Sequence, residues 1–128
     1  VCAELERQLG ELDPEDARAY LASLGLERSA LDSVVTAGYR LLDLITFFTI
    51  KGVETRAWTV RLGTSAPKAA GKIHTDMERG FIRAEVIQWD LLLREGSFGA
   101  AREHGRVRIE GKDYVVQDGD VILFRFNV

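Results

Sequence analysis

RAWTVRLGTSAPKAAGKIHTDMERGFIRAEVI occupies residues 56–87 and decides the fold of this chain. Apolar and polar side chains alternate over 55–62, which predicts a strand. Small residues over 66–73, with Ser65 as the N-cap, predict a short helix. A polar turn follows, and β-type residues over 81–89 predict another strand. The stretch therefore predicts a strand, a helix and a strand in close succession.

The second of these strands sets the register of the expected sheet. Ile82, Ala84 and Val86 alternate with Arg83 and Glu85. Successive side chains of a strand point to opposite faces, and a slip of one residue would exchange the two sets. We therefore expect the three apolar side chains to be buried beneath the short helix, and Arg83 and Glu85 to be exposed.

GKDYVVQDGDVILFRFNV closes the sequence over residues 111–128. β-Type residues at 107–109 and 114–116 lie on either side of a glycine-containing turn, which predicts a hairpin. Asp118-Gly119 predicts a further turn, followed by a last strand over 121–126. The C-terminal part of the chain is therefore expected to form a sheet with short helices, an α+β fold.

Helices are predicted upstream of the sheet. Asp13 before a proline marks one helix start, and Ser29, three residues before Asp32, marks another. The second helix carries an apolar stripe at helical spacing: Leu31, Val34, Val35, Gly38, Leu41 and Leu42. Two short helices cannot bury this stripe by themselves, so we expect a sheet or a further domain to cover it.

The chain divides into two parts that differ in charge. A strand is predicted over 45–50, so we place a helical piece at residues 1–45 and a sheet domain at residues 46–128. The first part holds 4 Arg and Lys against 9 Asp and Glu (−5), and the second holds 13 against 11 (+2). A positive balance favours an anionic partner for the sheet domain, although dedicated nucleic-acid binders are more basic.

Composition narrows the class of protein. A length of 128 residues with 46% hydrophobic side chains is typical of one globular domain, or of a small domain with a partner piece. Cys2 is the single cysteine, so no internal disulfide can form, as in a reducing cytoplasm. The longest apolar run, 41–50, falls short of the ~20 residues that span a bilayer. We expect no membrane segment, and the start at Val1 suggests a piece of a longer protein.

No motif for catalysis is predicted in this chain. No glycine begins a GxxxxGK[ST] phosphate loop, so the chain alone is not expected to hydrolyse nucleotide. His74 and Asp76 could form an acid–base pair, but turn and capping chemistry explains them more simply. Cys2, His74 and His104 lack metal-ligand spacing. We therefore expect neither catalytic residues nor a metal site.

Basic residues are the main functional candidates. They are Arg56, Arg61, Lys68, Lys72, Arg79, Arg83, Arg106, Arg108 and Arg125. Guanidinium groups combine charge with a planar fork that suits phosphate. The alternative, equally open, is a solvated face balanced by neighbouring acids. For the first alternative we expect Arg61, Arg83 and Arg108 to cluster on the open face of the sheet and bind RNA phosphates.

Aromatic side chains offer a weaker candidate surface. Stacking on unpaired bases needs exposed rings beside cations. Trp58 near Arg56, Phe81 near Arg83 and Phe126 beside Arg125 have that arrangement in sequence. Because most aromatic residues here lie at predicted strand positions, core packing is the favoured interpretation.

Residues 56–128 resemble a TGS domain, which has a β-grasp, ubiquitin-like fold, and specifically the C-terminal end of the YchF family of GTPase-like ATPases. The Ile73-His74-Thr75-Asp76 segment is a structural hallmark of that domain. Residues 1–45 resemble, more loosely, the end of the family's nucleotide-binding domain. By that match Cys2 and Ala3 would lie beside the purine base. Glu4 stands where the family commonly has Lys.

The resemblance implies a cytoplasmic parent protein that binds ATP, or GTP, with magnesium, hydrolyses it and associates with the ribosome. This chain itself is expected to hold no cofactor. Two functions are then open for its sheet domain. It could be a module that binds RNA or the ribosome, or it could be a regulatory module that docks on the parent's own nucleotide-binding domain.

Overall fold

The computed structural model describes residues 1–127, and Val128 lies outside the described residues. The chain forms two units, Val1–Leu42 and Asp43–Val128. The division therefore falls three residues before the position expected from the sequence. None of the helices described is both long and apolar enough to cross a membrane.

The first unit consists of three helices, α1 (Ala3–Glu11), α2 (Pro14–Ser23) and α3 (Ala30–Leu41). The Asp13 side chain accepts hydrogen bonds from two backbone N–H groups in the first turn of α2, and Ser29 does the same for one in α3. These caps satisfy donors that a helix leaves free at its start. Both predicted helix starts are confirmed.

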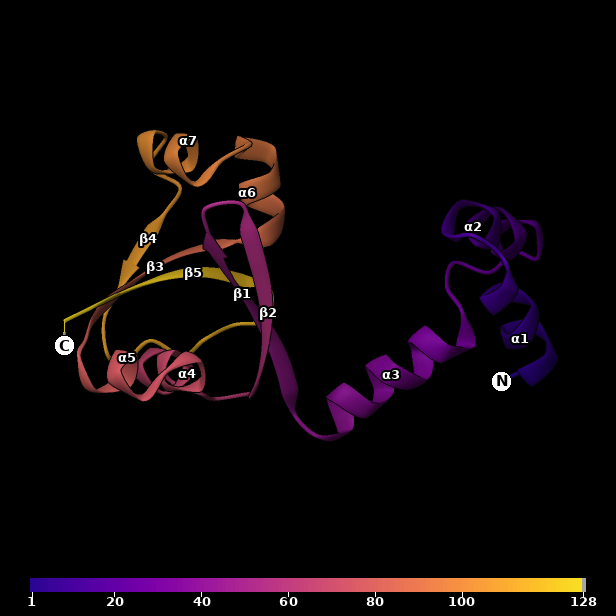
Figure 1. Ribbon diagram of the computed structural model, residues 1–128, viewed down its shortest axis with the longest axis horizontal. Coiled ribbons are helices and arrows are strands. Elements are labelled where there is room, and N and C mark those ends of the chain that lie inside the picture. The colour runs from indigo at the N-terminus through magenta and orange to yellow at the C-terminus, as the bar shows by residue number, and fades with distance from the viewer. Residues whose placement is uncertain (128) are drawn as a thin grey trace. The chain divides into compact units, whose positions relative to one another are not determined.

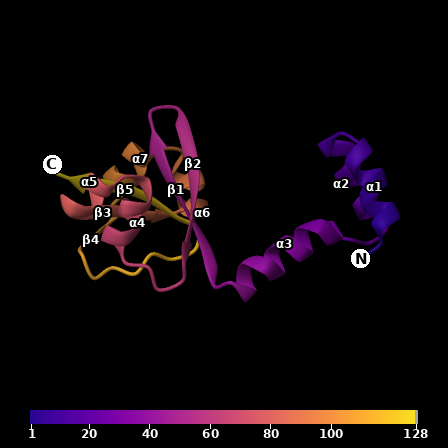
Figure 2. The same cartoon turned by 60° about the horizontal axis from the view of Figure 1, so that its bottom comes forward.

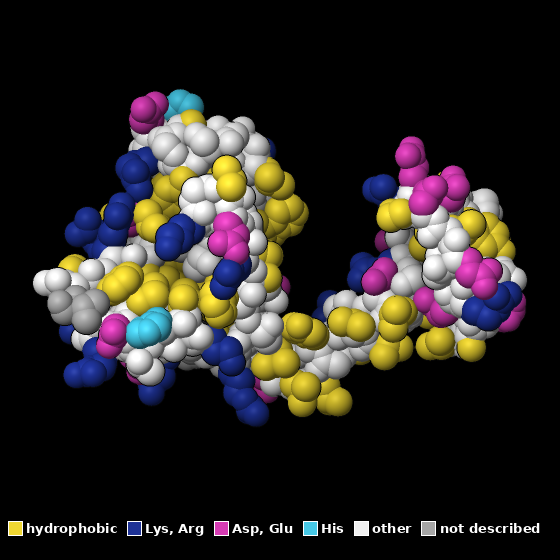
Figure 3. Space-filling view, viewed as in Figure 1, with side chains coloured by type: hydrophobic (Ala, Val, Ile, Leu, Met, Phe, Trp, Pro, Cys, Tyr) yellow, Lys and Arg dark blue, Asp and Glu magenta, His cyan; other side chains and the backbone are white. Residues whose placement is uncertain are grey.

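Contacts within the first unit join α1 to the other two helices. The Tyr20 hydroxyl donates to Gln8, and the Glu6 carboxylate accepts from the backbone N–H of Ala30. The apolar stripe of α3 remains exposed, as the hydrophobic side chains along this helix show in Figure 3: Leu31, Val34, Val35, Leu41 and Leu42. The unit thus has a small interior and one uncovered helix face.

The second unit contains one five-stranded sheet. Its strands are β1 (Leu44–Lys51), β2 (Glu54–Arg61), β3 (Phe81–Gln88), β4 (Arg108–Glu110) and β5 (Asp120–Phe126). Their spatial order is β2-β1-β5-β3-β4. β1 and β5 pair in parallel at the centre, and the other neighbouring strands pair antiparallel.

Helices cover both faces of the sheet (Figures 1 and 2). α4 (Ala66–Ile73) and α5 (Thr75–Arg79) lie on one side, which we call the α4 face. α6 (Trp89–Glu95) and α7 (Phe98–Glu103) lie on the other, which we call the α7 face. The unit is a mixed α+β structure with a single sheet, as predicted.

The α4 face holds the larger apolar core. Phe47 of β1 and Phe124 of β5 meet edge to face, with ring centroids 6.0 Å apart. Ala69 and Ala70 of α4 are fully buried against them, since small side chains let the helix approach the sheet closely. The α7 face buries a smaller cluster around Ile87, Val121 and Ala101.

The predicted burial of β3 is correct for some residues and wrong for others. Ala84 and Val86 are buried on the α4 face, and Arg83 is exposed, as expected. Ile82, however, is 52% exposed, because a β-bulge between Phe81 and Arg83 turns Phe81 into the core in its place. Glu85 is only 4% exposed, because α7 covers the opposite face of the sheet there.

The predicted hairpin between 107–109 and 114–116 is wrong. β4 pairs with β3 instead. The segment after it crosses to α4, where Tyr114 O accepts from the backbone N–H of Ala66 at 2.8 Å and Thr64 O accepts from that of Val116 at 3.0 Å. The Ser65 side chain makes no capping bond. Fully buried Val116 joins the α4-face core, and this burial outweighs a local hairpin.

Candidate functional site

The polar turn between α4 and α5 is a capping structure. His74 Nδ1 accepts a hydrogen bond from the backbone N–H of Asp76 at 3.1 Å, and both side chains are exposed. His74 is thus the N-cap of α5, the role that turn and capping chemistry predicts for it. Across residues 1–127, no group of three His, Cys, Asp or Glu side chains is placed to hold a metal ion.

The three arginines expected to cluster lie in three different places. Arg61 pairs with Leu44 at one end of edge strand β2, and Arg83 pairs with Arg125 near the end of β5. In the parallel pair of β1 and β5, Phe48 lies opposite Val121. Leu44 lies four residues before Phe48, and Arg125 lies four residues after Val121. Arg61 and Arg83 are therefore roughly 26 Å apart along the strands. Arg108 pairs with Val86 and so belongs to the opposite, α4 face.

Arg108 takes part in the packing of the chain around β5. Its Nη2 donates to the Tyr114 hydroxyl at 3.2 Å, its guanidinium lies 5.5 Å from the centre of that ring, and Asp120 is 3.8 Å away. The expectation of one shared arginine face is thus wrong. Strand parity alone cannot reveal that β4 presents Arg108 to the side of the sheet opposite Arg83.

Asp120 anchors this packing from the interior. It is fully buried and accepts hydrogen bonds from the Tyr114 hydroxyl (2.7 Å), the Gln88 amide (2.7 Å) and the backbone N–H of Gln117 (2.9 Å). Burial and the bond to Asp120 raise the pKa of Tyr114 to about 12. Both oxygens of this carboxylate accept hydrogen bonds from within the fold, and these bonds hold the loop before β5 in place.

A second set of arginines does gather on the α7 face. Glu85 projects from β3 and is buried, with Arg102 of α7 on Oε2 at 2.5 Å and Arg125 of β5 on Oε1 at 3.0 Å. Both guanidinium-bearing side chains remain about half exposed, at 51% and 46%. Arg83 lies beside Arg125 on the same face. We call Arg83, Arg102 and Arg125 the arginine cluster.

The charge state of Glu85 follows from these contacts. Burial alone would raise the pKa of its carboxyl group, but the hydrogen bonds from Arg102 and Arg125 outweigh burial and hold the pKa below its ordinary value. Glu85 is therefore ionised at neutral pH. The cluster keeps two positive charges in excess over this carboxylate.

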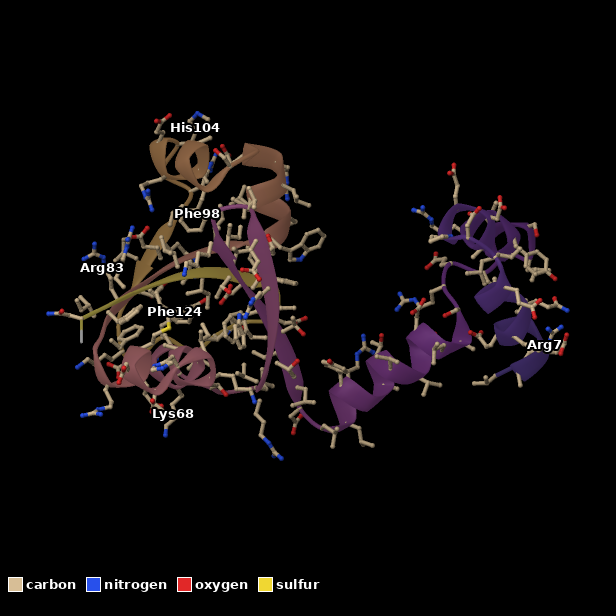
Figure 4. The ribbon with its side chains drawn as sticks, in the orientation of Figure 1. Arg7, Lys68, Arg83, Phe98, His104 and Phe124 are labelled. Atoms are coloured by element: carbon tan, nitrogen blue, oxygen red, sulfur yellow. The ribbon has the colours of Figure 1, made fainter. Side chains whose placement is uncertain are left out.

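The arginine cluster borders a groove between α7 and the sheet. The groove has a volume of about 220 Å³, and its lining includes Ile50, Phe98, Leu123, Arg102 and Arg125. Figure 4 shows Phe98 reaching from α7 toward the sheet and Arg83 at the outer end of the strands. In Figure 3, Lys and Arg side chains gather over β3 and β4 on this side of α7.

Sequence reasoning identified only part of this cluster. Arg83 was among the predicted contacts, and Arg125 was among the wider set of basic candidates. Arg102 was missed because it lies on a helix 17 residues after Glu85, and only the docking of α7 brings them together. Their opposite charges were visible in the sequence, but nothing in its spacing distinguishes this pair from an exposed one.

Cys2 and Ala3 lie at the start of the first unit. Ala3 begins α1, and Cys2 is the residue immediately before the helix. Cys2 is exposed and lines a shallow, mostly apolar groove of about 530 Å³ together with Leu5, Leu26 and Val34. Such a surface is compatible with a flat apolar ring, and its role beside a purine base stays a prediction.

Comparison with known proteins identifies the relatives of this chain. A family model described as YchF-GTPase_C, protein of unknown function (DUF933), matches residues 44–127. The Ribosome-binding ATPase YchF of Bacillus subtilis is 52% identical over all 128 residues, and Obg-like ATPase 1 of Rattus norvegicus is 49% identical over 96% of the chain. The chain spans about a third of the length of these relatives (35% and 31%).

A solved structure gives the same relationship. The YchF GTPase of Schizosaccharomyces pombe superposes with a TM-score of 0.81 and 36% sequence identity. The match covers 94% of this chain and 32% of the other.

Proposed function

Because residues 44–127 match its model, the chain belongs to the YchF-GTPase_C family, and we propose that it is the C-terminal region of a ribosome-associated nucleotide hydrolase. Its sheet unit is a binding module that contacts ribosomal RNA. Relatives that carry the whole of this chain are named ribosome-binding ATPases, which supports the assignment. Such a parent acts in the cytoplasm.

The β-grasp, TGS-type assignment belongs to this proposal. An N-terminal hairpin, a helix packed across the sheet, and first and last strands that run parallel at its centre support it. The Ile73–Asp76 segment, which the resemblance marks as a hallmark of the domain, covers the end of α4 and the start of α5.

The helical unit is the end of the parent's nucleotide-binding domain in this proposal. Cys2 and Ala3 would contact the purine of ATP or GTP, while the phosphates and magnesium would be held by residues outside this chain, which has no phosphate loop. The exposed stripe of α3 would pack against the rest of that domain. Covering such a stripe is the ordinary way in which an amphipathic helix is stabilised.

The arginine cluster carries the RNA-binding proposal. It places three exposed guanidinium groups on one face, where a phosphate chain can meet them. Arg61, at the far end of the sheet, would make a separate phosphate contact. Arg108 lies on the other face, and we assign it chiefly to the packing of Tyr114 and Asp120.

Binding of the chain to purified ribosomal subunits at two salt concentrations tests this function. We expect association that weakens steeply as salt rises, because phosphate contacts release counterions. The control is the same measurement with an unrelated protein of equal net charge. Absence of binding at low salt would refute the RNA-binding function.

A docking function is the second candidate, and a specific surface favours it. Trp89, Leu93 and Val53 are exposed, and an apolar groove of about 230 Å³ lies between α6 and the first hairpin. This surface would contact the parent's own nucleotide-binding domain. Protection of Trp89 that changes with the bound nucleotide in the full-length parent would support docking, and unchanged protection would contradict it.

A further inference from the structure

The arginine cluster is built around a buried carboxylate, which distinguishes it from a scattered surface charge. Arg83 and Arg125 are direct cross-strand partners, and like charges in such positions destabilise a sheet. Glu85 offsets this repulsion for Arg125 and also fixes Arg102, one guanidinium on each carboxylate oxygen. Two long side chains are thereby held in defined positions before any ligand arrives.

Donors remain available on these arginines. Arg125 uses Nε for Glu85, and Arg102 uses Nη2. Over residues 1–127, the structure gives no protein acceptor to their other N–H groups or to the Arg83 side chain. A guanidinium carries five donors in a planar fork that matches phosphate oxygens. The face can therefore grip an anion with its cations already oriented, which reduces the entropy lost on binding.

The adjoining groove favours an unpaired nucleotide. Its lining includes the apolar side chains of Ile50, Phe98 and Leu123, and the Arg102 guanidinium lies 5.5 Å from the centre of the Phe98 ring. Its volume of about 220 Å³ is below the range of ordinary ligand pockets, so it has room for part of a nucleotide at most. A duplex would present only its charged backbone here and leave the apolar side chains unused. A single strand presents phosphates together with sugar and base surfaces that apolar and aromatic side chains can cover.

We propose that the groove between α7 and β5 binds part of one nucleotide of single-stranded RNA, with its phosphate held by Arg102, Arg125 and Arg83. The proposal rests on the RNA-binding function above and names its site. Glu85 acts as a positioning residue that orients two of the three arginines. It touches no ligand itself.

Substitution of Glu85 tests whether RNA binding depends on the orientation of the arginines or only on non-specific electrostatic attraction. The whole chain is titrated with a fluorescently labelled ten-residue uridine RNA, and anisotropy is measured over a range of NaCl concentrations. Glu85→Gln removes one negative charge, as does the matched control Glu54→Gln at the exposed hairpin. We expect Glu85→Gln to weaken binding about three- to tenfold through lost orientation, whereas Glu54→Gln leaves it unchanged or stronger.

Arg83 provides a variant that does not affect the buried carboxylate. Arg83→Gln should lower the salt slope of single-strand binding by about 0.7, the value of one phosphate contact. Arg79→Gln, which removes the same charge from α5 on the other face, should leave the slope unchanged. Circular dichroism and urea unfolding of each variant establish that the fold is retained.

The outcomes are distinct. If Glu85→Gln and Glu54→Gln strengthen RNA binding equally, or if Arg83→Gln and Arg79→Gln have equal salt slopes, the proposed site is wrong. The RNA-binding function would still stand in that case if the wild-type chain binds ribosomal subunits. A duplex bound as tightly as the single strand, with the same loss in Arg83→Gln, would overturn the single-strand assignment. Failure of the wild-type chain to bind either RNA or ribosomal subunits would refute the function and the site together.

Discussion

Asp120 and Glu85 are the buried charged side chains among residues 1–127, and they are satisfied in different ways. Asp120 accepts its hydrogen bonds from neutral donors, a tyrosine, a glutamine and the backbone, and Arg108 lies 3.8 Å away without donating to it. Glu85 receives two arginines whose side chains are half exposed. The donors to Asp120 are groups of the fold that hold the carboxylate inside the sheet unit, whereas the donors to Glu85 are charged side chains that also face solvent.

This difference indicates that, within one small sheet, Asp120 has a structural role whereas Glu85 supports a binding surface. A buried carboxylate with a complete set of neutral donors contributes rigidity, since every acceptor is occupied by part of the fold. A buried carboxylate with half-exposed arginines also stabilises cations on the surface, where a ligand can reach them. The number of buried charges therefore says less about function than the chemistry of their partners.

Removal of Asp120 should give the largest effect. Asp120→Ala leaves the Tyr114 hydroxyl, the Gln88 amide and a backbone N–H without their acceptor, and we expect unfolding to become easier by about 2–4 kcal/mol. Urea unfolding followed by circular dichroism measures the change. Asp113→Ala, a substitution of an exposed aspartate in the loop, is the control and should have little effect. If Asp120→Ala lowered the free energy of unfolding by less than Glu85→Gln does, the structural role assigned to Asp120 would be wrong.

Glu85→Gln should have a smaller effect on stability, about 1–2 kcal/mol, because its arginine partners can be hydrated when the carboxylate is lost. The pKa of Glu85 is depressed in the folded state, so its contribution is complete above the ordinary value of 4.5 and disappears as the pH falls toward the folded pKa. Unfolding free energies of wild type and variant should therefore converge in acid. A gap that stays constant down to pH 2 would contradict the ion-pair explanation.

Tyr114→Phe isolates one donor to Asp120. We expect a loss of about 1 kcal/mol, since Asp120 keeps two other donors. The pKa of Tyr114 is raised to about 12, so the stabilisation is complete below its ordinary value of 10.0 and declines as the pH rises toward 12. Chemical unfolding at pH 7 and pH 11 tests the trend. A difference that grew with pH would show that the hydroxyl is not held as described.

Arg108→Gln should have the smallest effect. Arg108 lies near Asp120 but on the α4 face, so we expect the salt slope of RNA binding to stay within error of wild type. Stability should fall by less than about 1 kcal/mol, as for other half-exposed ion pairs. The anisotropy titration described above measures the slope. A drop equal to that of Arg83→Gln would mean that both faces contact RNA.

Local chemistry in the sequence predicted the elements that depend on neighbouring residues. The caps at Asp13 and Ser29 involve side chains and backbone groups within three residues of each other. The alternation over β2 is likewise local, with Val60 buried on the α4 face. These features follow from propensity and periodicity alone.

The errors in β3 and β4 have tertiary causes. An alternating strand predicts one buried face, but α7 packs on the second face and buries Glu85, while a bulge exchanges Ile82 for Phe81. The glycine turn at Gly111 is compatible with a hairpin or a longer crossing, and burial of Val116 decides between them. The arginine cluster depends on the docking of α7, which no spacing in the sequence specifies.

The position of β5 has a consequence for synthesis. It follows every other strand in the chain, yet it lies between β1 and β3 at the centre of the sheet. During translation the first hairpin and β3 cannot be joined until β5 has left the ribosomal exit tunnel. Its parallel pairing with β1 links residues more than 70 positions apart, as Phe48 and Val121 show. Such non-local contacts slow folding, so this unit should acquire its fold after its own synthesis rather than during it.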